Sequence, residues 1–413
     1  MLFHKLPLRL KRLTWLFSTI LLVAPGLGCQ KESARPAPAT PVAEPETPAG
    51  TSRLLSSTLI GEYSPQSLAG RVSGIPFAAA LIRYPIKVYR LTYATKNTNG
   101  QTVTASGALL VPQVPAGTTL PLLSYQHGTI SPADESRAPS YYSTSSEVYS
   151  AVSVLASTGY LVAASDYIGY GASKALPHPY EHAASLASAS LDMLRASKEF
   201  GAQQRLTLNN KTFLLGYSEG GYATLALHKL LEETATAEFT VAASAPGAGA
   251  YHKSAFARYI LNSTQPLNFL DSYVWVLETY NKVYGLNRPA TAYYNQPYAA
   301  QVQSGNYGSV PTQAAELFTA AFRQGVLSGT DTGMLNAFQA NDIHDWKPRA
   351  PLALFHGTAD DYVPFFNSQD AYNAMRARGA TQVQLRPIQG GNHFSSAAQY
   401  TLEAFAFISQ YNQ

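Results

Sequence analysis

Four short apolar runs that hardly alternate with polar residues limit the folds open to this chain. Strands covered on both faces of a parallel sheet have this composition, whereas strands with one face in water alternate. Two stretches of helical pattern, His182 to Phe200 and Gly221 to Leu231, lie among the runs. Repeated strand–helix units predict an α/β fold with a mostly parallel central sheet flanked by helices. The four runs cover residues 120–125, 160–165, 212–217 and 239–243.

An antiparallel hairpin is predicted ahead of these units. Residues 86–93 alternate with period two, as a half-buried strand does, and Asn99-Gly100 has the composition of a turn. Val103 to Val111 then follows as the second strand. Towards the C-terminus the alternation of strands and helices resumes, with strands at 352–355 and 382–386 and helices at 370–378 and 396–409.

Residues 251–345 interrupt that alternation. They are rich in tyrosine, glycine and proline and contain helix-like patches such as Ala314 to Phe322. We expect a helical cap over the C-terminal edge of the sheet. Aromatic-rich insertions either line a binding pocket or pack against the core, and the sequence leaves both roles open.

The N-terminus has the pattern of an export signal. Residues 1–28 carry four basic and no acidic residues, followed by a short apolar run over 13–24. This order is typical of a signal peptide, and the run is shorter than the ~20 residues of a membrane span. Residues 29–52 are rich in Ala and Pro, which predicts an extended linker, and the catalytic domain is then expected over 53–413.

Cys29, the only cysteine, follows the apolar run directly. Its position resembles a bacterial lipobox, in which this thiol is lipidated and becomes the first mature residue. Gly28 suits the signal peptidase, although Gly26 stands where the motif has a leucine-like residue. The resemblance implies a lipid-anchored protein of the cell envelope. The alternative is an ordinary secretory signal with an incidental cysteine.

Charge and cysteine content argue against nucleic-acid binding and against thiolate metal clusters. The chain has 29 basic and 25 acidic residues, and without the leader 25 of each remain. A neutral mature protein lacks the positive charge that nucleic-acid binding requires. A single cysteine excludes disulfides within the chain and thiolate metal clusters. The spacing of His178, His182 and nearby acidic residues matches no metal motif, so no metal site is expected.

The pentapeptide Gly216-Tyr217-Ser218-Glu219-Gly220 identifies a candidate nucleophile. A Gly-x-Ser-x-Gly match alone is weak evidence, but here an apolar strand precedes it and a helix follows it. Glycines permit a tight turn that exposes the Ser218 hydroxyl above the sheet. The alternative is an exposed serine in an ordinary turn.

A serine nucleophile needs a base, and His393 is the best candidate of nine histidines. It lies in Gly390-Gly391-Asn392-His393, a glycine-rich loop between the last predicted strand and the terminal helix. Loops at this edge of an α/β sheet present catalytic groups.

Five motifs together resemble the α/β-hydrolase superfamily and span residues 121–394. They are the Ser218 turn, the His393 loop, the His-Gly pair at 127–128, the Asp-x-x-Gly-x-Gly-x-Ser turn at 166–173, and Gly-x-x-Asp-x-x-Val-Pro at 357–364. Several of them, with the long cap, are similar to secreted bacterial esterases and lipases related to the secretory-lipase branch. The chain is therefore expected to adopt the α/β-hydrolase fold.

The resemblance implies roles for further residues. It selects Asp360 as the carboxylate that orients the base, with Asp361 as its rival. It implies an oxyanion hole formed by the backbone N–H groups of Glu219 and Thr129, with Gly128 as the alternative to Thr129. His127 and Asp166 are expected to be structural.

The reaction that this resemblance implies is hydrolysis of carboxylic esters through an acyl-enzyme, without a metal or organic cofactor. A peptidase or amidase with the same triad is one rival, because the same groups cleave amides. A non-catalytic surface lipoprotein on a hydrolase scaffold is the other.

Overall fold

The computed structural model describes residues 52–73 and 78–412. The predicted signal peptide, Cys29 and nearly all of the predicted linker lie outside these residues. The described part belongs to one compact unit, Thr51–Gln413. None of its helices combines the length and the apolar character that crossing a membrane requires.

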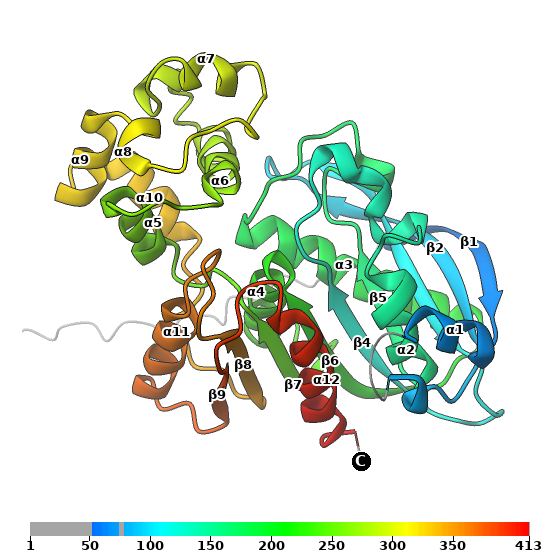
Figure 1. The fold of residues 1–413 in the computed structure, drawn as a ribbon. Coiled ribbons are helices and arrows are strands. Elements are labelled where there is room, and N and C mark those ends of the chain that lie inside the picture. Colours follow the sequence, from blue (N-terminus) through cyan, green and yellow to red (C-terminus); the bar gives the residue numbers. More distant parts are fainter. Residues whose placement is uncertain (1–51, 74–77, 413) are drawn as a thin grey trace, which may run out of the picture. The chain divides into compact units, whose positions relative to one another are not determined.

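A single nine-stranded sheet forms the centre of this unit (Figure 1). Its order is β1-β2-β3-β5-β4-β6-β7-β8-β9, in which the first four strands pair antiparallel and the pairs from β5 onwards are parallel. The predicted α/β-hydrolase fold is confirmed. The strands are β1 (Leu54–Tyr63), β2 (Ile86–Lys96), β3 (Thr102–Pro112), β4 (Leu120–Gln126), β5 (Leu161–Ser165), β6 (Leu208–Tyr217), β7 (Thr240–Gly247), β8 (Leu352–Gly357) and β9 (Val383–Ile388).

The non-alternating runs are the central strands, as predicted. β4 and β5 are buried at every position, because helices cover both faces of the sheet there. The predicted hairpin is β2–β3, and its turn places Gly100 at a φ of 75°. The edge strand β1 was not predicted, because its sequence neither alternates nor forms an apolar run. Most of its residues are exposed.

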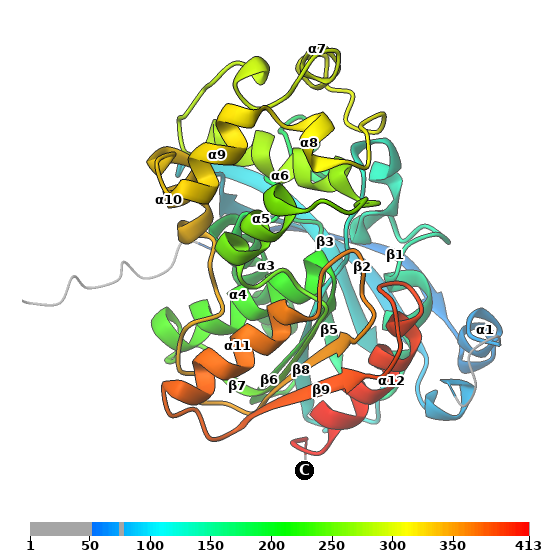
Figure 2. The same cartoon turned by 60° about the vertical axis from the view of Figure 1, so that its left-hand side comes forward.

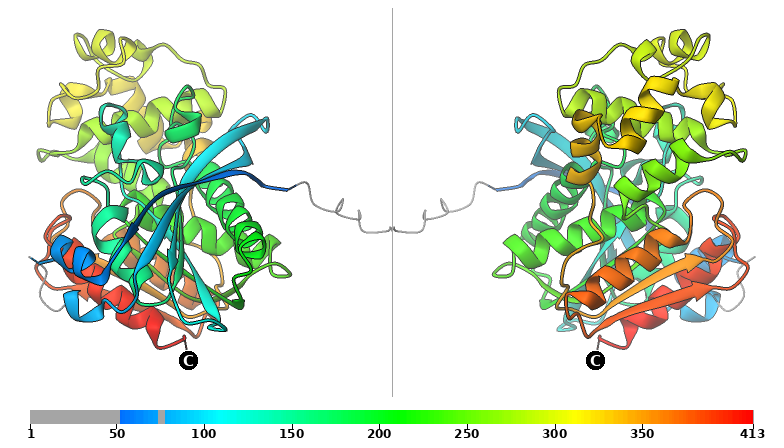
Figure 3. Two further views of the ribbon diagram at one scale, coloured as in Figure 1. Left: turned by 90° about the vertical axis from the view of Figure 1, so that its right-hand side faces the viewer. Right: turned by 90° about the vertical axis from the view of Figure 1, so that its left-hand side faces the viewer.

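Helices cover the two faces of the sheet as separate sets (Figure 3). α3, α4 and α11 pack on one face, and α1, α2 and α12 pack on the other. α12 agrees with the helix predicted at 396–409. The bounds are α1 (Pro65–Arg71), α2 (Ser153–Ser157), α3 (Ala183–Gln203), α4 (Glu219–Thr234), α11 (Phe366–Ala377) and α12 (Ser396–Ser409). Short turns of 3-10 helix lie at Ala78–Leu81, Pro132–Arg137, Pro139–Tyr141, Gly171–Ser173 and Ala290–Ala292, and a π-helical turn lies at Val148–Val152.

The segment between β7 and β8 forms a helical layer above the C-terminal ends of the parallel strands (Figures 1 and 2). It has an apolar core of its own, built mainly from aromatic and aliphatic side chains of its own helices. We call residues 251–345 the cap. Its helices are α5 (Lys253–Asn262), α6 (Leu270–Val283), α7 (Tyr298–Gln303), α8 (Ala314–Leu317), α9 (Ala320–Ser328) and α10 (Thr332–Ala340).

One helix expected in the cap is broken in two. The patch Ala314 to Phe322 contains the whole of α8 and the start of α9. Phe318 is extended between them and bridges to Tyr294, and the Thr319 side chain accepts a hydrogen bond from Phe322 N. A threonine in this position caps a new helix rather than continuing the old one.

Candidate active site

Ser218 lies in the sharp turn between β6 and α4. Its backbone has a φ of 61° and a ψ of −125°, and its N–H donates to Gly247 O at 2.9 Å. A positive φ is unfavourable for a residue with a side chain and persists only where the surroundings impose it. The turn therefore holds the Ser218 hydroxyl above the C-terminal ends of the strands.

The glycines of the pentapeptide are required by close backbone packing. A Cβ on Gly220 would lie 2.1 Å from Gln126 O, and one on Gly216 would lie 2.6 Å from the same oxygen. Neither position has room for a methyl group, so the turn can approach β4 only with glycine on both sides of the serine.

Three side chains form a continuous hydrogen-bonded chain from this turn. His393 Nε2 lies 2.8 Å from Ser218 Oγ, and His393 Nδ1 lies 2.7 Å from Asp360 Oδ2. A carboxylate only accepts, so Nδ1 carries the proton and Nε2 is free to accept from the serine hydroxyl. The three residues come from the β6–α4 turn, the loop after β8 and the loop after β9.

The Asp360 carboxylate is buried and is surrounded by hydrogen-bond donors. Its Oδ1 accepts from the N–H groups of Tyr362 at 3.0 Å and Val363 at 2.9 Å, and His356 Nε2 lies 3.4 Å from Oδ2. Burial alone would raise the pKa of this carboxyl, but His356 and His393 outweigh it and lower the pKa to about 2.

The neighbouring carboxylate points elsewhere. Asp361 is exposed and its Oδ2 accepts a 3.4 Å hydrogen bond from the Asn268 amide. The geometry thus brings Asp360, and not its rival Asp361, to His393.

Candidate oxyanion donors lie where β4 ends and α4 begins. The Gly128 N–H points at the Glu147 carboxylate, with distances of 3.3 and 3.4 Å to its two oxygens. The N–H groups of Thr129 and Glu219 donate to no partner within residues 52–73 and 78–412. Between the two candidates in this loop, Thr129 is therefore the one with an uncommitted donor.

Two acidic side chains beside the turn, the partly buried Glu147 and the buried Glu219, make contacts that were not predicted from the sequence. The Glu147 carboxylate accepts from Tyr125 Oη at 2.7 Å as well as from Gly128. Glu219 Oε1 lies 2.7 Å from His178 Nε2, and both side chains are fully buried. No local motif marks either contact, because each joins residues far apart in the chain.

His127 and Asp166 have the structural surroundings expected of them. His127 Nδ1 lies 2.7 Å from Gly128 O, and its Nε2 lies 3.3 Å from Asp166 O. The Asp166 carboxylate accepts from Ser140 N at 2.7 Å and Ser106 Oγ at 2.5 Å. These bonds connect the turn after β5 to β3 and to the loop after β4.

A pocket opens beside Ser218 under the cap. Two acidic residues, Glu181 and Asp361, are among its lining residues, and the buried Glu181 forms an ion pair with Lys253 of α5. The remaining lining is mostly apolar, and it comes largely from α5, α6 and the loop between them: Phe256, Tyr259, Ile260, Leu267, Phe269, Leu270, Tyr273 and Val276.

Comparison with known proteins shows which family this chain belongs to. The model of the secretory lipase family matches residues 136–411, more than half of the 413-residue chain. The chain belongs to the secretory lipase family. It is a carboxylic ester hydrolase of the serine type. No curated protein matches the chain at a significant level.

Solved structures agree with the fold of this secretory lipase. A Legionella pneumophila protein described as a hydrolase is 24% identical, with a TM-score of 0.78 over 87% of this chain and 98% of its own. The esterase LipA of Xanthomonas oryzae, described as degrading rice cell walls, is 26% identical, with a TM-score of 0.73 over 86% and 96%. Candida antarctica lipase A in its closed state is 19% identical, with a TM-score of 0.63 over 88% and 82%.

Proposed function

We propose that Ser218, His393 and Asp360 are the catalytic triad of this secretory lipase and cleave esters through an acyl-enzyme. The observation that carries the proposal is the unbroken chain of hydrogen bonds from Ser218 Oγ through His393 to Asp360, at 2.8 and 2.7 Å. Nucleophile, base and orienting acid stand within the distances that such catalysis requires.

In the first half-reaction, Ser218 Oγ attacks the ester carbonyl carbon while its proton passes to His393 Nε2. Asp360 stays ionised, holds Nδ1–H and stabilises the imidazolium. His393 then gives the proton to the departing alcohol oxygen, which leaves the acyl group on Ser218.

In the second half-reaction, water loses a proton to His393 Nε2 and attacks the acyl carbon. The proton returns to Ser218 Oγ as the carboxylic acid leaves. The N–H groups of Glu219 and Thr129 stabilise the oxyanion in both steps, and each donor contributes about 3 kcal/mol to the barrier reduction. Gly128 supports the loop, because its N–H faces Glu147.

The apolar side of the pocket accommodates the acyl chain. Aromatic and aliphatic side chains of α5 and α6 line the wall beside Ser218, and burial of each acyl CH₂ contributes about 0.8 kcal/mol to binding. We expect p-nitrophenyl esters of medium or long acyl chains to have a higher kcat/KM than the acetate.

The test combines an ester panel with covalent labelling. Wild type is expected to hydrolyse p-nitrophenyl esters between C2 and C16 and to react with a fluorophosphonate. Ser218→Ala should abolish labelling and lower kcat by about 10⁴-fold or more. Ser145→Ala, at an exposed serine outside the pocket, is the matched control. Full activity in Ser218→Ala would refute the triad, and a wild type that neither turns over nor labels would favour the binding-protein alternative.

Membership of a secretory lipase family supports export, and we propose that the exported protein is lipid-anchored through Cys29. Residues 1–28 would be removed as the signal peptide, and residues 29–52 would hold the catalytic domain away from the membrane. Cells fed a palmitate analogue should label wild type but not Cys29→Ala. Unlabelled wild type would leave the ordinary secretory signal as the explanation.

A further inference from the structure

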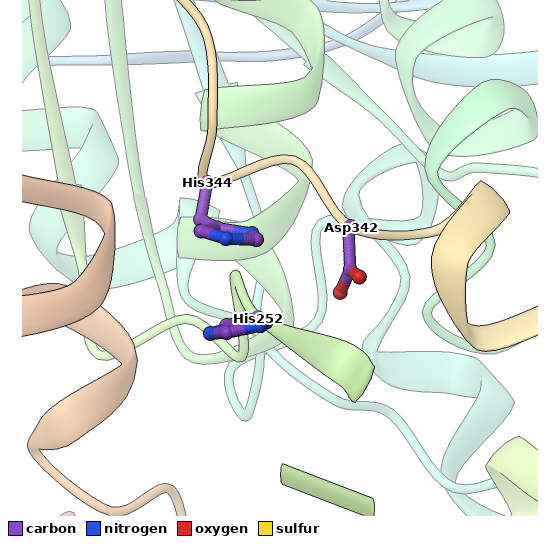
Figure 4. Close-up of side chains that lie close together, drawn as sticks. All are labelled: His252, Asp342 and His344. Carbon is purple, nitrogen blue, oxygen red and sulfur yellow. The ribbon is translucent and has the colours of Figure 1, made fainter. Parts of the chain in front are cut away.

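Two histidines and an aspartate converge at the base of the cap, away from the triad (Figure 4). His252 precedes α5 at the start of the cap, and Asp342 and His344 follow α10 at its end. One ligand atom of each residue lies within 4.8 Å of those of the other two. The three residues therefore come from both segments that connect the cap to the sheet, and they lie close together.

We propose that His252, His344 and Asp342 bind one Zn²⁺ ion, or a first-row transition ion of similar preference. Two imidazole nitrogens and a carboxylate oxygen suit these ions, whereas Ca²⁺ and Mg²⁺ prefer oxygen ligands alone. Local spacing gave no reason to expect this site, since His252 is 90 positions from Asp342 and the fold alone brings them together.

His252 and Asp342 each have hydrogen-bond partners of the kind that orient the ligands of a metal ion. His252 Nδ1 lies 2.7 Å from Asp370 Oδ2, so Nδ1 carries the proton and Nε2 is left as a lone-pair donor. Histidine ligands are held in this way by a carboxylate on the opposite ring nitrogen. Ser254 donates its N–H at 3.0 Å and its hydroxyl at 2.6 Å to Asp342, which orients that carboxylate.

The third proposed ligand, His344, has a ring nitrogen without a hydrogen-bond partner among the described residues. Nδ1 of His344 is buried and has no hydrogen-bond partner among the residues that the structure describes. A buried ring nitrogen without a partner costs free energy, and coordination is one way to satisfy it. A purely structural pair of stacked histidines leaves this atom unexplained.

Binding requires the two rings to turn relative to each other, because stacked imidazoles do not direct their in-plane lone pairs at one ion. The two imidazoles stack with centroids 3.7 Å apart and planes 19° from parallel, and Asp342 lies at their side (Figure 4). Tetrahedral zinc with bonds of about 2.1 Å separates its ligand atoms by about 3.4 Å, which is less than the 4.8 Å limit seen here. Rotation of the partly exposed side chains brings the atoms together and leaves a fourth position for water.

Zinc at this position would cross-link both ends of the cap to each other. Asp370 belongs to α11, so the group also contacts a helix on the sheet. The site is structural in this view: the ion stabilises the attachment of the cap and takes no part in ester cleavage.

The experiment measures zinc binding to the untagged full-length chain after removal of metal with a chelator. Competition with a chromophoric chelator should give one Zn²⁺ per wild-type chain, and Ca²⁺ should not compete. His344→Ala should weaken the affinity at least 100-fold and Asp370→Asn about 10–100-fold. Zinc should raise the Tm of wild type but not of His344→Ala.

Asp345→Asn is the matched control, since this exposed neighbour pairs with Arg378 outside the group. It should bind zinc as wild type does. Equal affinity in wild type and His344→Ala, or no stoichiometric binding to wild type, would overturn the proposal. If the variants fold poorly by circular dichroism, X-ray absorption of zinc-loaded wild type decides: two imidazole nitrogens at about 2.0–2.1 Å support the site, and their absence refutes it.

Discussion

Asp360 and Asp361 differ in surroundings although they are adjacent in sequence. The Asp360 carboxylate is buried and accepts hydrogen bonds from backbone and histidine donors, whereas Asp361 is exposed. Sequence reasoning could narrow the acid to this pair but separated the two only by motif alignment. In the structure the two side chains point in different directions from the loop after β8: Asp360 points to His393, and Asp361 points to Asn268.

This difference predicts unequal effects of two isosteric substitutions. Asp360→Asn is expected to lower kcat about 10⁴-fold, because an amide no longer holds His393 in the productive tautomer. Asp361→Asn should keep kcat within about threefold, since an exposed carboxylate is screened by solvent. Steady-state kinetics on one p-nitrophenyl ester measures both. Equal loss in the two variants would contradict the assignment.

The pKa of Asp360 also predicts how stability depends on pH. Folding lowers it from 3.8 to about 2, so the folded state favours the ionised form. The stabilisation is complete above about pH 5 and is lost as pH falls through about 2. It amounts to about 2.5 kcal/mol in the free energy of unfolding. Urea titrations from pH 5 to pH 2 should show a steeper decline for wild type than for Asp360→Asn, and parallel curves would contradict this.

At the scale of elements, the strand–turn–helix unit β6–α4 is the part best predicted from sequence. An apolar strand, a Gly-x-Ser-x-Gly turn and a helix follow one another without interruption, so local pattern suffices. Cap helices are less predictable, because short segments such as α8 and α9 depend on contacts with other segments. The bridge between Tyr294 and Phe318 is one such contact.

Close packing of that turn predicts a strong effect of one added methyl group. In Gly220→Ala the new Cβ would meet Gln126 O at 2.1 Å, which forces β4 and the turn apart. We expect a loss of several kcal/mol in the free energy of unfolding and loss of ester hydrolysis. Gly70→Ala in α1, where no atom lies within 4 Å of the added Cβ, should change stability by less than about 1 kcal/mol. Thermal unfolding of both variants tests this contrast.

At the scale of the molecule, the cap and the sheet domain meet beside the pocket. Lys253, the first residue of α5, forms a buried ion pair with Glu181, which precedes α3. Neither residue belongs to a recognisable motif. The pair joins the cap to the sheet domain in the same region as the His252 group.

Removing one member of this pair should cost more than removing both. Lys253→Met leaves the Glu181 carboxylate buried without its cation, and we expect about 3–5 kcal/mol of destabilisation. Lys253→Met combined with Glu181→Leu should recover most of that loss, since apolar replacement of both partners is often neutral. Chemical denaturation at pH 7 compares the three proteins. A double variant as unstable as the single one would show that the pair contributes more than charge compensation.

Local sequence pattern was enough to predict the fold class, the strand–turn–helix unit around Ser218 and the loop that carries His393. Each of these depends on residues close together in the chain, where periodicity and turn chemistry act. Tertiary structure decided which aspartate faces His393, that Gly128 N–H is committed to Glu147, and that His252 meets His344. Those contacts join residues 19 to 92 positions apart or depend on the direction of a side chain. Only packing of the whole chain sets distances of that kind.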